Sequence, residues 1–232
     1  MIAYNKPFKF LYIVVMIMVA GCNNSSTNDN SNIYGVAMIG SQIWMSENLN
    51  VDHFRNGDPI PEAKTKEEWQ RAAEKQQPAW CYYNNDPAMG EKYGKLYNWY
   101  AVNDSRQIAP EGFHIPTKAE YNHLIEFLGG EKNAGIKLKN TSGWDFCLCF
   151  GNHGWGDGNN KSGFSGLPGG HLITGLDFGF GYKGEQAIWW TSSYDNQLRG
   201  YAICYILYNF DQEVTESGAP FDEGLSVRCI KD

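Results

Sequence analysis

We predict an α+β domain over residues 33–232, because helix signals occupy the first half of this segment and strand signals occupy its last third. Two Thr-x-x-Glu patterns each precede a stretch of helix-forming residues. Short apolar segments separated by turn formers follow in the last fifty residues. The segment contains no low-complexity break and no repeat of fixed period, so we treat it as one domain.

Both helices are predicted from a capping box, in which a Thr and a Glu three residues later satisfy each other's backbone N–H groups. Thr65 with Glu68 begins a segment that ends before Pro78, and Thr117 with Glu120 begins the next one. A third, short helix is expected over 133–139. The second helix has the strongest pattern, with apolar residues at i, i+3, i+4 and i+7 followed by two glycines: Tyr121, Leu124, Ile125, Leu128, Gly129 and Gly130.

Strands are predicted at 39–45, 188–194, 201–208 and 225–230, where aromatic and β-branched residues are concentrated. Residues 140–186 are rich in glycine and aromatic residues and lack a regular pattern. A stretch of that length without secondary structure is unusual in a compact domain unless it forms functional loops. We therefore expect a ligand-facing loop region there.

The first thirty-two residues are predicted to direct and anchor the protein. Two lysines precede an apolar run at 10–20 that is too short to cross a bilayer, as in a secretory signal. The run ends in Val-Ala-Gly-Cys, which resembles a bacterial lipobox and implies lipidation of Cys22. An ordinary secretory signal with Cys22 present by chance is the alternative. We thus expect a signal peptide at 1–21 and a lipidated Cys22 that holds the protein on a membrane, in the cell envelope and at the outer membrane.

Residues 22–32 are predicted to form a flexible tether, since none of the side chains after the cysteine can join a core. Its span is about 17 Å for a random coil of this length. Loss of residues 1–21 removes two lysines, which leaves 17 basic against 26 acidic residues and changes the formal net charge from −7 to −9. No basic block occurs, so we expect no nucleic-acid partner. Whether the domain faces the periplasm or the outside stays open.

Six segments occur in order along most of the domain: 43–49, 79–86, 93–102, 110–117, 162–170 and 226–229. Together they resemble the Fibrobacter succinogenes major paralogous domain, a family of secreted proteins and lipoproteins with no settled activity. The His-Ile-Pro-Thr-x-x-Glu segment and the closing Ser-Val-Arg-Cys also resemble the C-type-lectin-like fold of sulfatase-modifying enzymes. This resemblance implies two helices packed on small antiparallel sheets, with long loops facing a ligand and a C-terminal strand that lies near the N-terminal one.

The cysteines depart from the family pattern at one position. Ala109 stands where members often have a Cys, which would plausibly pair with the Cys of the terminal segment. Cys229 is therefore either free or paired with Cys204 on a neighbouring strand. With Cys22 lipidated, an odd number of cysteines is left, so at least one thiol is unpaired. The connectivity stays open among the remaining five: Cys81, Cys147, Cys149, Cys204 and Cys229.

Two patterns that could indicate a metal or nucleotide site have simpler interpretations. Cys147-x-Cys149 with His153 lacks the spacing of structural zinc sites, so a buried or bridged pair is favoured. Gly179-x-Gly181-x-x-Gly184 has the letters of a dinucleotide fingerprint but opens no predicted helix, so a glycine-rich turn is favoured. We expect no catalytic residue, no resident metal and no cofactor, and bound Ca²⁺ is the alternative.

The glycine-rich loop at 151–160 is the best candidate ligand site. Carboxylate and amide oxygens there could hold Ca²⁺ or accept hydrogen bonds from sugar hydroxyls, and an indole could stack on a sugar ring. A simple glycine turn with a packed Trp is the competing interpretation. The candidate ligand-binding residues are Trp144, Trp155, Asp157, Asn159 and Asn160.

These observations predict a lipid-anchored envelope protein that binds a glycan or a protein on its loop face. The first alternative is a structural or adhesin component of the cell surface. The second is an oxidase related to the sulfatase-modifying enzymes, which would need two cysteine sulfurs close together in a cleft. The orientation of the domain and its oligomeric state are open.

Overall fold

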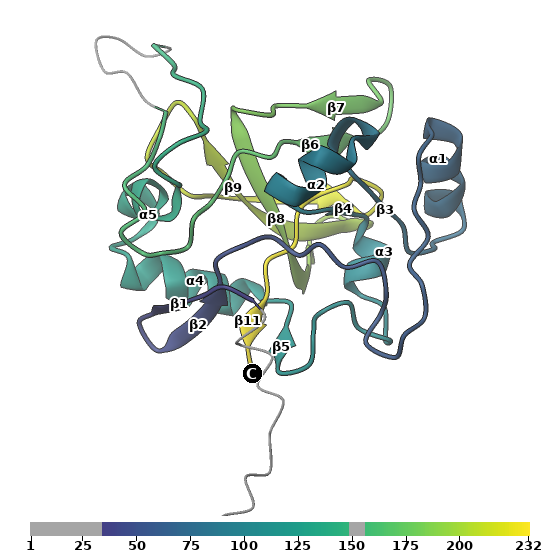
Figure 1. Ribbon diagram of the computed structural model, residues 1–232, viewed down its shortest axis with the longest axis horizontal. Coiled ribbons are helices and arrows are strands. Elements are labelled where there is room, and N and C mark those ends of the chain that lie inside the picture. The colour runs from purple at the N-terminus through teal and green to yellow at the C-terminus, as the bar shows by residue number, and fades with distance from the viewer. Residues whose placement is uncertain (1–33, 149–155) are drawn as a thin grey trace, which may run out of the picture.

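The computed structural model describes residues 34–148 and 156–232 (Figure 1). The predicted signal peptide, the tether with Cys22, Cys149 and Trp155 lie outside these residues. Five α-helices occur in the described residues: α1 (Lys66–Glu74), α2 (Pro87–Tyr93), α3 (Trp99–Val102), α4 (Lys118–Phe127) and α5 (Glu131–Leu138), with a 3-10 turn η2 (Tyr83–Asn85). The strands are β1 (Val36–Ile39), β2 (Gln42–Met45), β3 (Trp80–Cys81), β4 (Leu96–Tyr97), β5 (Phe113–His114), β6 (His171–Ile173), β7 (Gly179–Gly181), β8 (Gln186–Tyr194), β9 (Tyr201–Tyr208), β10 (Thr215–Pro220) and β11 (Ile230–Lys231).

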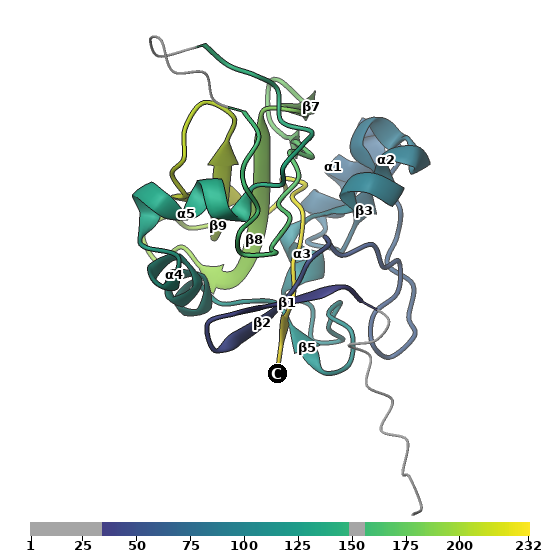
Figure 2. The ribbon, with the colours of Figure 1, turned by 60° about the vertical axis from the view of Figure 1, so that its left-hand side comes forward.

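A three-stranded antiparallel sheet, in the order β10-β9-β8, separates two hydrophobic cores. Successive side chains of a strand point to opposite faces, so β8 and β9 supply alternate residues to each core. On one face, α4 and α5 cover the sheet, and on the other face lie α3 and the C-terminal segment (Figures 1 and 2). Burial on both faces explains why the sequences of β8 and β9 are almost continuously apolar.

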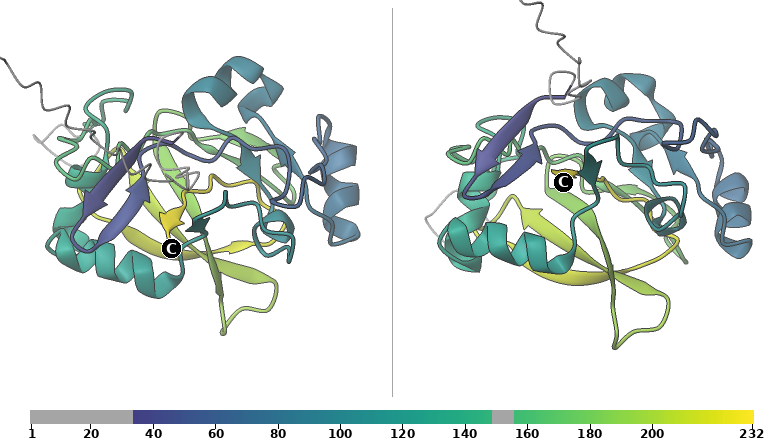
Figure 3. Two further views of the ribbon diagram at one scale, coloured as in Figure 1. Left: turned by 60° about the horizontal axis from the view of Figure 1, so that its bottom comes forward. Right: turned by 90° about the horizontal axis from the view of Figure 1, so that it is seen from below.

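The two ends of the domain meet in a second sheet, in the order β1-β2-β11-β5. Ile230 of β11 pairs with Trp44 of β2 and with His114 of β5, in both cases antiparallel. Figure 3 shows the β1–β2 hairpin beside the C-terminus. The expected closing of the sheet by the C-terminal strand near the N-terminal one is thus confirmed, as is the strand end at His114 that leads into α4.

The two predicted capping boxes are present and begin α1 and α4. Thr65 and Thr117 each accept a hydrogen bond from the backbone of the Glu three residues later, and that Glu side chain accepts one in return. The third, short helix expected over 133–139 is present as α5, whereas α2 and α3 were not predicted. Helix α2 begins at Pro87 and is capped by Asp86, a local signal that the sequence analysis did not use.

Two strand predictions need correction. Residues 39–45 are not one strand but parts of a hairpin, because Gly40 turns the chain between β1 and β2 with φ of +63°. Only the end of 225–230 is a regular strand. The residues before it pair singly with different neighbours, for example Leu225 with Tyr97 and Ser226 with Trp189, so no continuous ladder forms. In the described part of 140–185, the strands are β6 and β7, and the rest of these residues form loops, as the irregular pattern predicted.

Seven tryptophans in the described residues are buried, and each indole N–H donates a hydrogen bond. A buried indole requires such an acceptor, since an unpaired N–H in the core is unfavourable. The aromatic richness of the sequence is therefore largely core packing. No helix in residues 34–148 and 156–232 has the length and hydropathy to cross a membrane.

Candidate functional site

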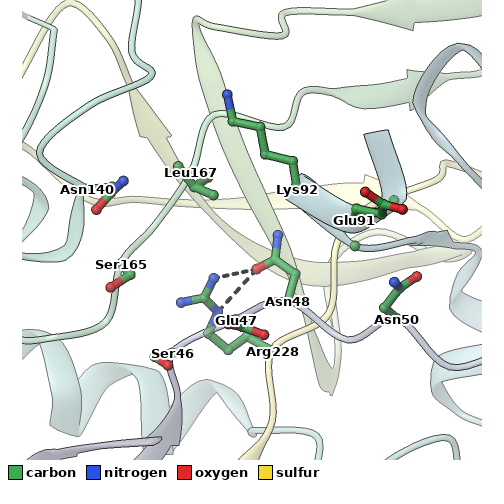
Figure 4. A pocket seen from close by; sticks show the side chains of 12 residues that line it. Ser46, Glu47, Asn48, Asn50, Glu91, Lys92, Asn140, Ser165, Leu167 and Arg228 are labelled. Atoms are coloured by element: carbon green, nitrogen blue, oxygen red, sulfur yellow. Dashed lines mark hydrogen bonds between the residues drawn. The ribbon is translucent and has the colours of Figure 1, made fainter. Parts of the chain in front are cut away.

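A recess of ≈ 290 Å³, called here the central recess, lies where four distant parts of the chain meet. Its lining comes from residues 46–50 after β2, from the end of α2 at 90–94, from Asn140 with 165–167, and from Arg228. The recess therefore includes one wall from the long loop region between α5 and β6. Figure 4 shows Asn140, Ser165 and Leu167 on one side of Arg228, with Glu91 and Lys92 on the other.

Arg228 is 1% exposed and has no carboxylate partner in the described chain. Its guanidinium lies over the ring of Phe164, with 4.3 Å between the guanidinium carbon and the ring centroid, and donates a hydrogen bond to the Phe164 carbonyl oxygen. Burial lowers the pKa of Arg228 to about 10, which still leaves it charged at neutral pH. Glu47 favours the charged form without forming a salt bridge, and a fully buried cation with no carboxylate in contact is rarely tolerated for stability alone.

Asn48 holds this guanidinium in place. Its Oδ1 accepts hydrogen bonds from Nε and Nη2 of Arg228, at 3.1 and 2.6 Å, and from Nε1 of Trp189 at 2.8 Å. Its Nδ2 donates to the Tyr93 carbonyl oxygen at 2.9 Å, which ties the loop after β2 to the end of α2. One amide side chain thus joins three elements around the recess.

A glycine allows α2 to end against this loop. Gly94 has φ of +76°, and a Cβ there would lie 2.7 Å from the backbone oxygen of Leu49. The next residue, Lys95, donates its backbone N–H to the same oxygen at 3.1 Å. Close approach of the two backbones therefore fixes the position of the Glu91–Lys92 rim.

The rim carries groups of both charges and several neutral polar groups. Glu47, Glu91 and Lys92 are exposed charged residues, and the neutral ones are Ser46, Asn50, Asn140 and Ser165. Such a lining offers hydrogen-bond donors and acceptors together, and with Arg228 its formal charges balance. The arrangement suits a polar ligand of no large net charge better than a strongly charged one.

One of the sequence-predicted residues supports the wall of this recess. The Oδ1 of Asn160 accepts a hydrogen bond from the Ser165 backbone N–H at 2.8 Å, and its Nδ2 donates to the Ser165 hydroxyl at 2.9 Å. Ser165 has a positive φ of +57°, which needs this local support. Asn160 thus positions a lining residue without lining the recess itself.

The other predicted residues make structural contacts. Trp144 is 6% exposed and donates its indole N–H to the Gly166 carbonyl oxygen at 3.1 Å, so its ring faces offer little room to a sugar. Asp157 Oδ1 accepts the Trp144 backbone N–H at 3.0 Å, and Asn159 Oδ1 accepts the Lys161 backbone N–H at 3.1 Å. One oxygen of each of these two exposed side chains therefore supports the loop backbone. Trp155 lies outside the described residues.

Three cysteines, Cys81, Cys204 and Cys229, are free and buried, so the possible Cys204–Cys229 bridge is not formed. Burial raises the pKa of Cys204 and of Cys229 to about 12, which keeps both thiols protonated. Cys147 is disulfide-bonded. No group of three His, Cys, Asp or Glu residues that could hold a metal occurs in the part of the chain described, and none of the three free thiols lines the central recess.

Arg228 and Asn48 were not predicted as site residues, although both lie in segments that carried the family resemblance. A usable signal was present: Arg228 interrupts the otherwise apolar stretch at 225–230. An Arg in a segment expected to be buried needs a partner or a ligand. Asn48 has no comparable signal, because its partner is 180 positions away in the sequence.

Comparison with known proteins gives one match. Residues 37–231 match the family model of the Fibrobacter succinogenes major domain. Neither a search of curated proteins nor a search of solved structures found a match.

Proposed function

The chain belongs to the Fibrobacter succinogenes major domain family, and we propose that it is a binding module whose central recess holds one polar residue of a glycan. The observation that carries the proposal is Arg228, a buried cation without a carboxylate partner, placed in a recess of ≈ 290 Å³ with polar walls. That volume corresponds to roughly ten water molecules, at the small end of ligand pockets. It suits a single sugar residue rather than a long segment of polymer.

The polar lining favours a sugar over an apolar ligand. Sugar hydroxyls donate and accept hydrogen bonds, and the recess presents amides, hydroxyls, carboxylates and an ammonium group around one opening. A protein ligand is the alternative, with a polar side chain occupying the recess. We propose no catalytic residue, since none of the three free thiols lines the recess and the thiols of Cys204 and Cys229 are held protonated.

We also propose that the mature protein is anchored in the outer membrane by lipid on Cys22 and tethered by residues 22–32. The lipobox and the polar composition of the tether support this assignment. In Figures 1 and 2, β1, where the described chain begins, lies far from the β6–β7 hairpin. A domain tethered near β1 would therefore present the β6–β7 end away from the membrane.

A C-type-lectin-like fold is part of the same proposal. Support comes from the pairing of β2 with β11, which joins the two ends of the domain, and from the long loop segment between α5 and β8. Within that fold a calcium ion at the Asp157 loop remains the alternative to metal-free binding. Asp157 Oδ1 and Asn159 Oδ1 each accept one backbone hydrogen bond, and a calcium ion would use the remaining lone pairs of these side chains.

The test is a glycan array probed with residues 23–232, which lack Cys22 and contain every described element. It should be probed once with calcium and once with a chelator. Binding that survives the chelator supports recognition by the polar recess alone. Binding that disappears with the chelator supports a calcium-dependent lectin and the Asp157 loop. Absence of binding under both conditions overturns the glycan proposal and favours a protein ligand.

A structural or adhesin role is the second candidate from the sequence, and an oxidase is the third. Stable self-association of residues 23–232 in size-exclusion chromatography with light scattering would favour the adhesin, and a strictly monomeric profile would count against it. The oxidase needs two neighbouring cysteine sulfurs that bind a metal together. A metal-loading assay in which no metal is bound by a pair of thiols would therefore exclude the oxidase.

A further inference from the structure

A second cavity, of ≈ 250 Å³, lies on the α3-facing side of the three-stranded sheet, and we call it the sheet-face cavity. Ile188 of β8 and Ile206 of β9 are register partners in its lining, and Ala219 of β10 adds a third apolar surface. This part of the cavity can accept a short hydrocarbon chain. The remaining lining includes polar groups whose bonding capacity is unused.

His171 is one of these groups. It is 7% exposed, and its Nδ1 is buried without a hydrogen-bond partner. Its ring stacks against Tyr182, with 5.4 Å between ring centroids and 9° between the planes. Burial lowers the pKa of His171 to about 4, so the imidazole is neutral at neutral pH and one ring nitrogen is an acceptor. A buried polar atom left unpaired points to a missing partner.

Glu223 is the second such group. Its side chain makes no hydrogen bond or ion pair with the described chain, and burial, with a smaller effect of Asp222, raises its pKa to about 7. Among the described residues, no Lys or Arg lines the sheet-face cavity, in contrast to the central recess. Within the described chain, the cavity therefore combines the Glu223 carboxyl group, which has no basic partner, the His171 ring, which has a nitrogen without a hydrogen-bond partner, and an apolar surface.

We propose that the sheet-face cavity binds a primary ammonium group on a short hydrocarbon chain, with Glu223 as its counter-ion. The ammonium has three donors, which can be shared between the Glu223 carboxylate, a nitrogen of His171 and the hydroxyl of Ser217. The chain packs on Ile188 and Ile206, and the half-exposed ring of Tyr182 adds a cation–π surface. The same chemistry is present in a lysine side chain and in a free alkylamine. This site is independent of the one proposed for a glycan.

The test is an NMR titration of ¹⁵N-labelled residues 23–232 with three probes. These are n-butylammonium chloride, Nα-acetyl-lysine methylamide, and n-butanol, which replaces the ammonium by a hydroxyl. We expect saturable shifts of the amides near His171 and Glu223 with an ammonium probe, and at least about tenfold weaker binding of n-butanol. Binding of both ammonium probes identifies a lysine side chain as a ligand, and binding of butylammonium alone identifies a free amine.

Glu223→Gln keeps the size of the side chain and removes its charge, so it should weaken ammonium binding at least about tenfold. Glu213→Gln is the matched control, because it removes the same charge from an exposed acid outside the cavity, and its affinity should equal that of the parent. Unchanged amide shifts outside the cavity establish that the Glu223→Gln domain is folded. The proposal is overturned if Glu223→Gln binds as tightly as the parent, if n-butanol binds as well as butylammonium, or if no probe gives saturable shifts.

Discussion

Replacement of Asn48 by Ala should destabilise the domain far more than its partial exposure suggests. The substitution removes the acceptor of three hydrogen bonds, two from the Arg228 guanidinium at 3.1 and 2.6 Å and one from the Trp189 indole at 2.8 Å. An unpaired buried N–H costs about 1–3 kcal/mol, and loss of the partner of a buried charge costs about 3–5 kcal/mol. These contributions overlap, so we expect a loss of about 4 kcal/mol.

Asn48→Asp is the matched variant. A carboxylate at this position still accepts all three hydrogen bonds and also supplies the counter-ion that Arg228 lacks. The cost is the hydrogen bond that Asn48 Nδ2 donates to the Tyr93 carbonyl oxygen, together with the repulsion between that oxygen and the new carboxylate oxygen, which the new ion pair with Arg228 offsets. We therefore expect the free energy of unfolding of Asn48→Asp to lie within about 1 kcal/mol of the parent.

Urea unfolding of residues 23–232, followed by tryptophan fluorescence, measures the effect. Asn48→Ala should lower the midpoint with an unchanged m value, and in thermal unfolding it should lower the Tm by about 8–16 °C for a domain of this size. The reasoning is refuted if Asn48→Ala loses less than about 1 kcal/mol or if Asn48→Asp is as unstable as Asn48→Ala.

Three further outcomes are expected. Arg228→Met should lose about 1–3 kcal/mol, because removal of a buried charge offsets only part of the loss of its hydrogen bonds to Asn48 Oδ1 and the Phe164 carbonyl oxygen. It should also abolish ligand binding in the array, and a folded Arg228→Met domain that binds normally would contradict the assignment. Thr117→Ala should cost about 1 kcal/mol in urea unfolding, because Thr117 Oγ1 accepts the N3 backbone N–H of α4. Burial lowers the pKa of His114, but its bonds to Glu120 and Asp232, each 2.8 Å long, outweigh burial and raise it above 6.5. The stability that His114 adds is therefore complete below pH 6.5 and is lost as the pH rises through the raised pKa. As the pH rises from below 6.5 to above the raised pKa, the urea midpoint of His114→Gln should fall less than the urea midpoint of the parent.

Local chemistry explains which elements could be predicted. The capping boxes at Thr65 and Thr117 involve residues three apart, so the sequence contains the whole motif. Strands β3 and β4 have two residues each and pair across an intervening helix, which leaves no periodic pattern to detect. The 225–230 segment was predicted as a strand, but its division among several partners depends on elements distant in the sequence.

The candidate site was predictable only in part, for the same reason. Two residues of the predicted loop region, Asn140 and Ser165, line the central recess. Trp144 has the composition of a sugar-stacking residue, and only its tertiary contacts show that it belongs to a core. Asn48 and Arg228 meet across 180 positions of sequence, and a contact of that range requires the complete fold.

The most direct test of the central recess compares two double variants on the glycan array. Asn140→Ala with Lys92→Ala removes an amide and an ammonium group from the lining of the recess. Asn196→Ala with Lys75→Ala removes the same groups from exposed positions outside it. We predict that the first pair lowers binding at least about tenfold, as expected for loss of one neutral and one charged hydrogen bond, and that the second pair binds like the parent. Equal binding by both pairs would contradict the assignment of the recess.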